Sequence, residues 1–198
     1  MKEKTIVRGQ TAVKGESVAT AALAEQLETR ARDYMRRCHE TVPSVERHTI
    51  WSRLYAASER LSMAVRDGDV ADAVIEIGSN LLGCEEIVVV ELHAETKLMS
   101  FLASVGVSAT QRHALSSKFH QIAAEIKRGQ ARIVDKRVAG DEFLASIGVS
   151  ALAPLSQGQK TGAIVFFNLL PQRKSFDSGD RELLGLLSVY VGPSLFGT

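Results

Sequence analysis

Helical periodicity dominates the first third of the chain. In the first stretch, apolar residues recur at steps of four, four, three and four, so they share one helical face: Leu23, Leu27, Ala31, Tyr34 and Cys38. Pro43 interrupts this pattern because a proline disfavours helix at the residue before it, and we expect a second helix from about Ser44. Its apolar seam alternates steps of three and four, as in a coiled coil: Trp51, Leu54, Ser58, Leu61 and Val65.

These two apolar stripes need a covering surface. Either they pack on the sheet of their own domain, or a second copy of the chain covers them. Two consecutive amphipathic helices offer more apolar face than one small sheet can cover. We therefore expect a homodimer through Leu23 to Val65, which charged substitutions at Leu54 and Leu61 weaken without unfolding the sheet domain.

Strand patterns begin after a third helix, which Asp69 is placed to cap and Gly83 to end. Ile87 to Leu92 is a nearly continuous, β-branched apolar run, which predicts a central strand buried on both faces. Leu98 to Ser104 is expected to return as a second strand. A long polar connection that contains Gln111 to His113 is expected next, before a further helix.

The pattern that follows completes an antiparallel sheet. Residues 131–135 predict a short third strand, and one helical turn is expected near Glu142. Residues 149–155 and 161–169 flank a glycine-containing turn, so they predict an antiparallel hairpin.

A closing helix is expected at the end, with Asp177 as its cap and Gly192-Pro193 as its terminator. This order predicts an α+β fold: an antiparallel sheet of about five to six strands flanked by helices and preceded by long N-terminal helices. We divide the chain into a mobile N-terminal arm (1–16), a helical dimerisation and signalling segment (17–66) and a sheet domain (67–198).

Composition limits the function classes. The chain has 198 residues, 45% hydrophobic and 24% charged, which suits one main folded domain with an appendage. Lys and Arg number 24 against 23 Asp and Glu, so the net charge of +1 favours binding neither to nucleic acid nor to an acidic membrane. No apolar run has the length of a signal peptide or a membrane span, and we expect a cytoplasmic protein.

The residues that carry reactive side chains give little support for catalysis. Cys38 and Cys84 lie in different segments without CxxC spacing, which argues against a zinc site or a disulfide framework. Cys84 stands at the entry to the central strand, so we expect a buried structural residue. Asp141 and Glu142 are expected to be solvated loop residues. We expect no catalytic residue and no metal ligand, and we assign no cofactor.

Several segments after about Leu54 have the order and spacing of one known family: residues 73–84 running into a strand at 87–90, Ile133 to Asp135, residues 147–155, residues 161–167, Phe176-Asp177 and a leucine-rich terminal helix. The most specific pair is Ala153-Pro154-Leu155 followed, after a turn, by Gly162. Together these segments resemble the GAF domain family. The resemblance implies a GAF/PAS-like fold and a sensory or regulatory role.

The resemblance also implies a pocket on one side of the sheet, roofed by the irregular middle of the chain. Family members bind cyclic nucleotides, tetrapyrroles, haem, metals or small metabolites there. The Asn-Lys-Phe-Asp-Glu signature of the cyclic-nucleotide binders is not in register, because in Asp141-Glu142-Phe143 the phenylalanine follows the acidic pair. The glycine-containing turn that many members place before the middle helix is also missing from Ser116 to Ala124.

The candidate ligand contacts follow from that expected pocket. His113 and His120 fall in the region that would form the roof, and each is otherwise a solvated surface residue. Phe101, Phe119 and Phe143 would supply apolar walls.

Two hypotheses for the function remain open. The first is a ligand-responsive sensor; the second is a ligand-free dimerisation and interaction scaffold whose pocket is filled by its own side chains. The chain carries no kinase, cyclase or DNA-binding output, so in both cases it would act on a partner protein in trans. One enzymatic branch of the family reduces free methionine sulfoxide through several cysteines, and Cys84 alone does not provide that chemistry.

Overall fold

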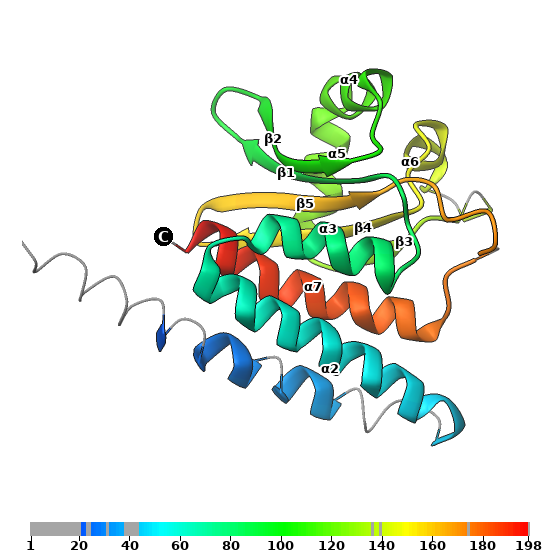
Figure 1. Ribbon diagram of the computed structural model, residues 1–198. Helices are drawn as coiled ribbons and strands as arrows, with labels where there is room; N and C mark the ends of the chain where they lie inside the picture. The colour runs from blue at the N-terminus through cyan, green and yellow to red at the C-terminus, as the bar shows by residue number, and fades with distance from the viewer. Residues whose placement is uncertain are drawn as a thin grey trace, which may run out of the picture.

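Five strands form one antiparallel sheet in the computed structural model of the chain, in the order β2-β1-β5-β4-β3 (Figure 1). The strands are β1 (Ile87–His93), β2 (Leu98–Val105), β3 (Arg132–Ile133), β4 (Ala151–Gln157) and β5 (Lys160–Phe166). The structure describes residues 21–22, 25–30, 32–37, 44–135, 137–138, 140–173 and 175–197. The predicted arm at 1–16 lies outside these residues.

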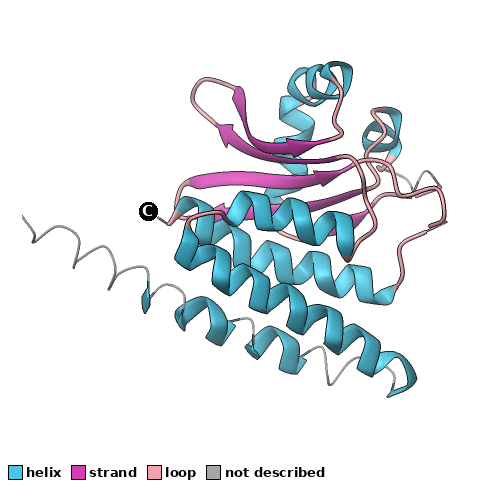
Figure 2. Ribbon diagram, in the orientation of Figure 1, coloured by secondary structure: helices cyan, strands magenta, loops and turns pink. Residues whose placement is uncertain are grey.

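Helices cover both faces of the sheet, so the fold has a layered α+β architecture (Figure 2). We call one face the helical side; it is built from α2 (Ser44–Asp67), α3 (Val70–Asn80) and α7 (Ser178–Phe196). On this side α3 and α7 contact the sheet, and α2 packs against both of them. We call the other face the roof side; it is built from the shorter α4 (Ala109–Ser117), α5 (Phe119–Lys127) and α6 (Glu142–Ser146).

The central strand β1 is buried on both faces, as its apolar run predicts. Ile87 and Val89 belong to the helical-side core, whereas Val88 and Val90 belong to the roof-side core. Successive side chains of a strand alternate between the two faces, so an apolar residue is needed at every position where both faces are covered. This explains why the run is continuous rather than alternating.

The predicted hairpin is confirmed as β4 and β5, joined by a tight turn at which Gly158 has a φ of 60°. Gly162 lies where β5 pairs with β1, and a Cβ atom there would come within 2.2 Å of the Val90 carbonyl oxygen. Only glycine fits that contact without moving the backbone. The predicted third strand is reduced to the two residues of β3, and the helical turn expected near Glu142 is α6.

One prediction for the middle of the chain is wrong. Gln111 to His113 lie in helix α4 and not in a polar connection. The Ser108 hydroxyl accepts from the Gln111 backbone N–H at 3.2 Å, and the Gln111 side chain accepts from the Ser108 backbone N–H at 2.8 Å. This reciprocal capping box satisfies N–H groups that would otherwise lack partners at the start of the helix.

Two helix ends also differ from the sequence prediction. Helix α7 does begin with the predicted Asp177 cap, but it continues through Gly192-Pro193 to Phe196, whose ring is buried in the helical-side core and stabilises the last turn. Asp69 occupies the N-cap position of α3 but makes no side-chain cap. Its carboxylate instead accepts from the Arg60 guanidinium on α2 at 3.2 Å.

The apolar seam of α2 faces the inside of its own chain. Leu54 and Leu61 are fully buried in the helical-side core, where α2 packs against α3 and α7. The prediction that these leucines form a dimer seam is therefore wrong. They pack within their own chain, against α3 and α7 rather than directly on the sheet as the alternative had it. In the preceding stripe, Leu27 is also buried in this core and the half-buried Tyr34 packs against it; the expected members at positions 23, 31 and 38 lie outside the described residues.

Candidate functional site

The three phenylalanines expected to line a pocket meet on the roof side. Phe119 is buried there, and Phe101 and Phe143 are half-buried and pack against the same apolar group. We call this group the roof-side cluster; it comprises Val88, Val90, Leu92, Val107, Leu115, Phe119, Ile122, Ile126, Leu144, Val149, Leu152, Ala163, Val165 and Phe167. Its members come from the sheet, from all three roof helices and from the adjoining loops, so they lie between these two layers.

The two candidate histidines lie on the outer surface of the roof. His113 on α4 and His120 on α5 are both exposed, and neither belongs to the roof-side cluster. The His120 ring stands edge-on to the Phe119 ring, with 5.7 Å between their centres. Sequence reasoning thus placed both histidines in the correct layer, and the structure places them on its solvent face.

A cavity of about 140 Å³ lies at the margin of the roof side, beside α6. Its walls are formed by Val134, Ala145, Gly148, Val149, Ser150 and Asn168. The five predicted contact residues do not line it. Pockets for organic ligands typically measure roughly 300 to 1,000 Å³, so this cavity is too small for a nucleotide or a tetrapyrrole.

A network of buried ion pairs holds the roof to the sheet. Arg132 of β3 donates to the carboxylates of Glu125 on α5 and Asp141 before α6, and both carboxylates are almost completely buried. Arg128 also donates to Glu125, at 2.7 Å. Asp141 was expected to be solvated, and its burial is a correction. Because charges out of water require partners, these contacts bind two roof helices to one strand.

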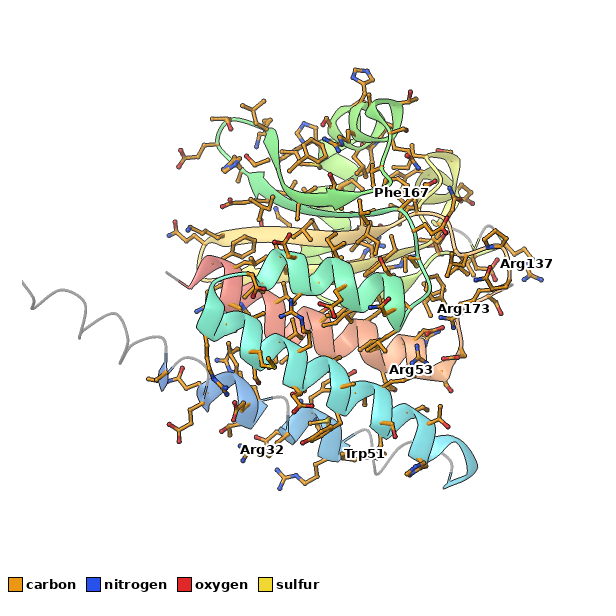
Figure 3. All side chains as sticks on the ribbon, in the orientation of Figure 1. Arg32, Trp51, Arg53, Arg137, Phe167 and Arg173 are labelled. Carbon is orange, nitrogen blue, oxygen red and sulfur yellow. The ribbon has the colours of Figure 1, made fainter. Side chains whose placement is uncertain are left out.

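A second buried network crosses the helical side. The fully buried Asp180 carboxylate accepts from Arg53 of α2 and from Arg173 in the loop before α7, and Figure 3 labels both arginines near this end of the layer. Arg53 also donates to the Leu81 carbonyl oxygen at 2.7 Å, just after α3. These hydrogen bonds tie α2, α3 and α7 together at one end.

Asp177 borders this second network. Burial favours a higher pKa for its carboxyl group, but the backbone N–H of Asp180 and the guanidiniums of Arg53 and Arg173 outweigh burial and hold that pKa below its ordinary value. The Asp177 carboxylate therefore stays charged in moderate acid and keeps its hydrogen bond to the first turn of α7, at 2.8 Å.

Cys84 is fully buried in the helical-side core. Burial raises the pKa of its thiol to about 12, although the positive charge of Arg173 acts in the opposite direction. The thiol is therefore protonated at neutral pH, and only a thiolate acts as a nucleophile. Cys38 lies outside the described residues.

A larger hollow lies on the outside of the helical side, between the N-terminal helical residues 25–30 and 32–37 and helix α2. Its volume is about 640 Å³. We call it the α2 groove; it is lined by Glu28, Arg32, Met35, Trp51, Tyr55, Ser58, Glu59, Ser62, Met63 and Arg66. Arg32 and Trp51 mark its two walls at the outer edge of the molecule in Figure 3.

Sequence reasoning missed two residues of this groove, Tyr55 and Met63. Their side chains are 63% and 51% exposed, although large apolar side chains are usually buried. A signal was present in the sequence, because Tyr55 directly follows Leu54 of the buried seam and Met63 lies two positions after Leu61. Large apolar residues just outside the seam of an amphipathic helix indicate a second apolar surface.

Comparisons with known proteins add no relative. A scan against family models and a search of curated proteins each find no match. In the part of the chain that the structure describes, His, Cys, Asp and Glu side chains form no group of three or more that would suit a metal ion. Within the same residues, every helix is too short or too polar to cross a membrane.

Proposed function

We propose that this chain is a non-catalytic, GAF-like interaction scaffold that forms a homodimer through its helical side and acts on a partner protein in trans in the cytoplasm. The antiparallel sheet flanked by helices supports the resemblance at the level of architecture. Fold alone does not assign function, so the proposal depends on what each side of the sheet presents.

The roof-side cluster is the single observation that carries this proposal. Buried side chains of the chain itself, including Leu115, Phe119 and Ile122, lie between the sheet and the roof helices, where the resemblance implies a ligand pocket. The two histidines that would contact a ligand are exposed instead. Protein interiors packed in this way leave few voids larger than a water molecule. These features favour the scaffold over the ligand-responsive sensor.

A search for a co-purified compound separates the scaffold from the sensor. The full chain is purified from cells without denaturation, and a matched mock purification is made from cells that lack it. Both eluates are then denatured and their small molecules measured by mass spectrometry. We expect that no compound is more abundant in the protein eluate than in the mock eluate by an amount near one molecule per chain. A compound at that ratio, released only on denaturation, would support the sensor and contradict the scaffold.

The absence of catalysis is tested with the one reaction that the resemblance makes plausible. The full chain is offered free methionine sulfoxide together with a thiol reductant. We expect sulfoxide reduction to be no faster than in a reaction that contains the reductant without the protein. The reason is that the buried Cys84 thiol is protonated at neutral pH. Turnover that is lost in Cys84→Ser would overturn both the non-catalytic assignment and the structural role of that residue.

A further inference from the structure

The spacing of the residues that line the α2 groove suits the binding of another helix. The residues of its α2 wall recur at steps of three or four over about four helical turns: Trp51, Tyr55, Ser58 or Glu59, Ser62 or Met63, and Arg66. On the opposite wall Glu28, Arg32 and Met35 have the same spacing. Two helices with such walls leave a channel between them, into which the ridge of a third helix fits.

Contacts within the chain hold the two walls of the groove in place. The Arg66 guanidinium of α2 donates to the Glu28 carboxylate at 3.0 Å. The Tyr34 hydroxyl lies 3.1 Å from the Glu182 carbonyl oxygen of α7, next to Gly185, where a Cβ atom would come within 2.0 Å of that hydroxyl. The groove therefore exists before anything binds, and binding does not have to order its walls.

The same surface carries both a groove and the side chains that would fill one. Tyr55 and Met63 line the groove and are more than half exposed. Tyrosine, tryptophan and methionine are the residue types enriched at the centre of protein interfaces, and Trp51 lies beside them. A two-fold symmetric contact places the same patch of both copies face to face, so it needs both parts on one surface, as here.

The charges of the groove also suit a second copy better than a partner of one sign. Glu28 and Glu59 are balanced by Arg32 and Arg66, so the lining has no net charge. Glu28 already pairs with Arg32 and Arg66 within the chain, and such a neutral surface meets its own copy without an excess of like charge. A strongly acidic or basic partner would face two residues of its own sign.

We infer that a second copy of this chain occupies the α2 groove, so that Tyr55 and Met63 of each copy enter the groove of the other around a two-fold axis. This inference rests on the proposed homodimer and deepens it. It moves the interface from Leu54 and Leu61, which are buried within one chain, to the adjoining exposed face of α2 that carries Tyr55 and Met63.

The test compares the assembly of three full-length proteins by sedimentation over a range of concentrations. They are the wild type, the double variant Tyr55→Glu with Met63→Glu, and the control Leu98→Glu. Leu98 on the edge strand β2 is 63% exposed, the same fraction as Tyr55, so the control adds a carboxylate at a matched apolar surface position. Circular dichroism and thermal melting show whether each protein is folded.

We expect a wild-type dimer, an unchanged dimer for Leu98→Glu, and for the double variant a dissociation constant raised at least about tenfold while the fold is retained. A double variant as dimeric as the wild type would overturn the inference while leaving the proposed dimeric scaffold intact. Dissociation caused by Leu98→Glu alone would place the interface on the β2 edge and also overturn it.

A wild-type chain that stays monomeric at every concentration would contradict both the inference and the dimeric part of the proposed function. The α2 groove would then be left for a helix of another protein. The extraction of small molecules and the sulfoxide assay would still test the remainder of the proposed function, because neither depends on assembly.

Discussion

The two sides of the sheet end in different kinds of surface. On the roof side, the apolar side chains stop at the roof-side cluster, and His113 and His120 face the solvent above it. On the helical side, a second apolar surface with Tyr55 and Met63 lies outside the buried core. Neighbouring large apolar residues that stay exposed indicate a binding surface. Tyr55 and Met63 therefore support the interaction that we propose on the helical side.

Truncation of Phe119 has the largest expected effect. If the roof side is a filled core, Phe119→Ala leaves a cavity and lowers the free energy of unfolding by about 3–5 kcal/mol. Equilibrium denaturation of the full chain measures this loss, and His120→Ala on the same helix is the control. A loss below about 1 kcal/mol would mean that the roof side has spare room, as a ligand pocket would.

Truncation of the buried seam comes next. Leu54→Ala is expected to lower the free energy of unfolding by about 2–5 kcal/mol, because Leu54 is fully buried. The matched change Met63→Ala, on the exposed face of the same helix, is expected to weaken the dimer while changing the stability of the monomer little. Denaturation at protein concentrations below the dimer dissociation constant reports the stability of the monomer alone, and so separates the two effects. Equal losses of monomer stability would refute the distinction between the two faces of α2.

The seam also shows where sequence reasoning succeeds and fails. The run at 87–92 predicted β1 well, because a strand buried on both faces needs apolar residues at every position. The spacing of Leu54 and Leu61 predicted a buried stripe correctly, but spacing does not say which surface covers it. That surface comprises α3, the next helix, and α7, which lies more than a hundred residues further along the chain.

The errors in local structure have different origins. The capping box of Ser108 and Gln111 was readable as a Ser-x-x-Gln pattern and would have predicted α4. Pro193 was taken as a helix end, although burial of Phe196 stabilises a further turn. The pairing of Arg53 with Asp180 joins residues far apart in the chain, so no local pattern reveals it.

Asp177 on the helical side is expected to contribute to the loss of stability in acid. The pKa of Asp177 is lowered in the folded chain, so its contribution is present above the unfolded pKa, about 3.9, and is lost as the pH falls through the folded value. Asp177→Asn therefore flattens the decrease of unfolding free energy below about pH 4. The effect is small because the side chain is 57% exposed and water screens its charges.

Asp135 on the roof side is the control for this pH measurement. Its pKa is also lowered, first by the Arg137 backbone N–H and then by the Arg137 side chain, two residues away. Because Arg137 is so close in sequence, its contact with Asp135 persists partly in the unfolded chain. It therefore contributes less to the free-energy difference between the folded and unfolded states. A larger change of slope in Asp135→Asn than in Asp177→Asn would contradict this assignment.

The smallest effect is expected from the candidate histidines. Both side chains are exposed, so His113→Ala with His120→Ala should change the free energy of unfolding by no more than about 0.5 kcal/mol per site. Thermal melting of the full chain checks this. A loss of several kcal/mol would show that the histidines support the roof in a way that their exposure conceals.

Native mass spectrometry of the full chain, purified from cells without denaturation, tests the central claim most directly, because it reports assembly and bound compounds together. The account predicts a species with the mass of two chains and no additional mass, since the helical side pairs and the roof side is full. A single-chain species that carries a bound compound, lost when the protein is denatured, would contradict the account on both sides of the sheet.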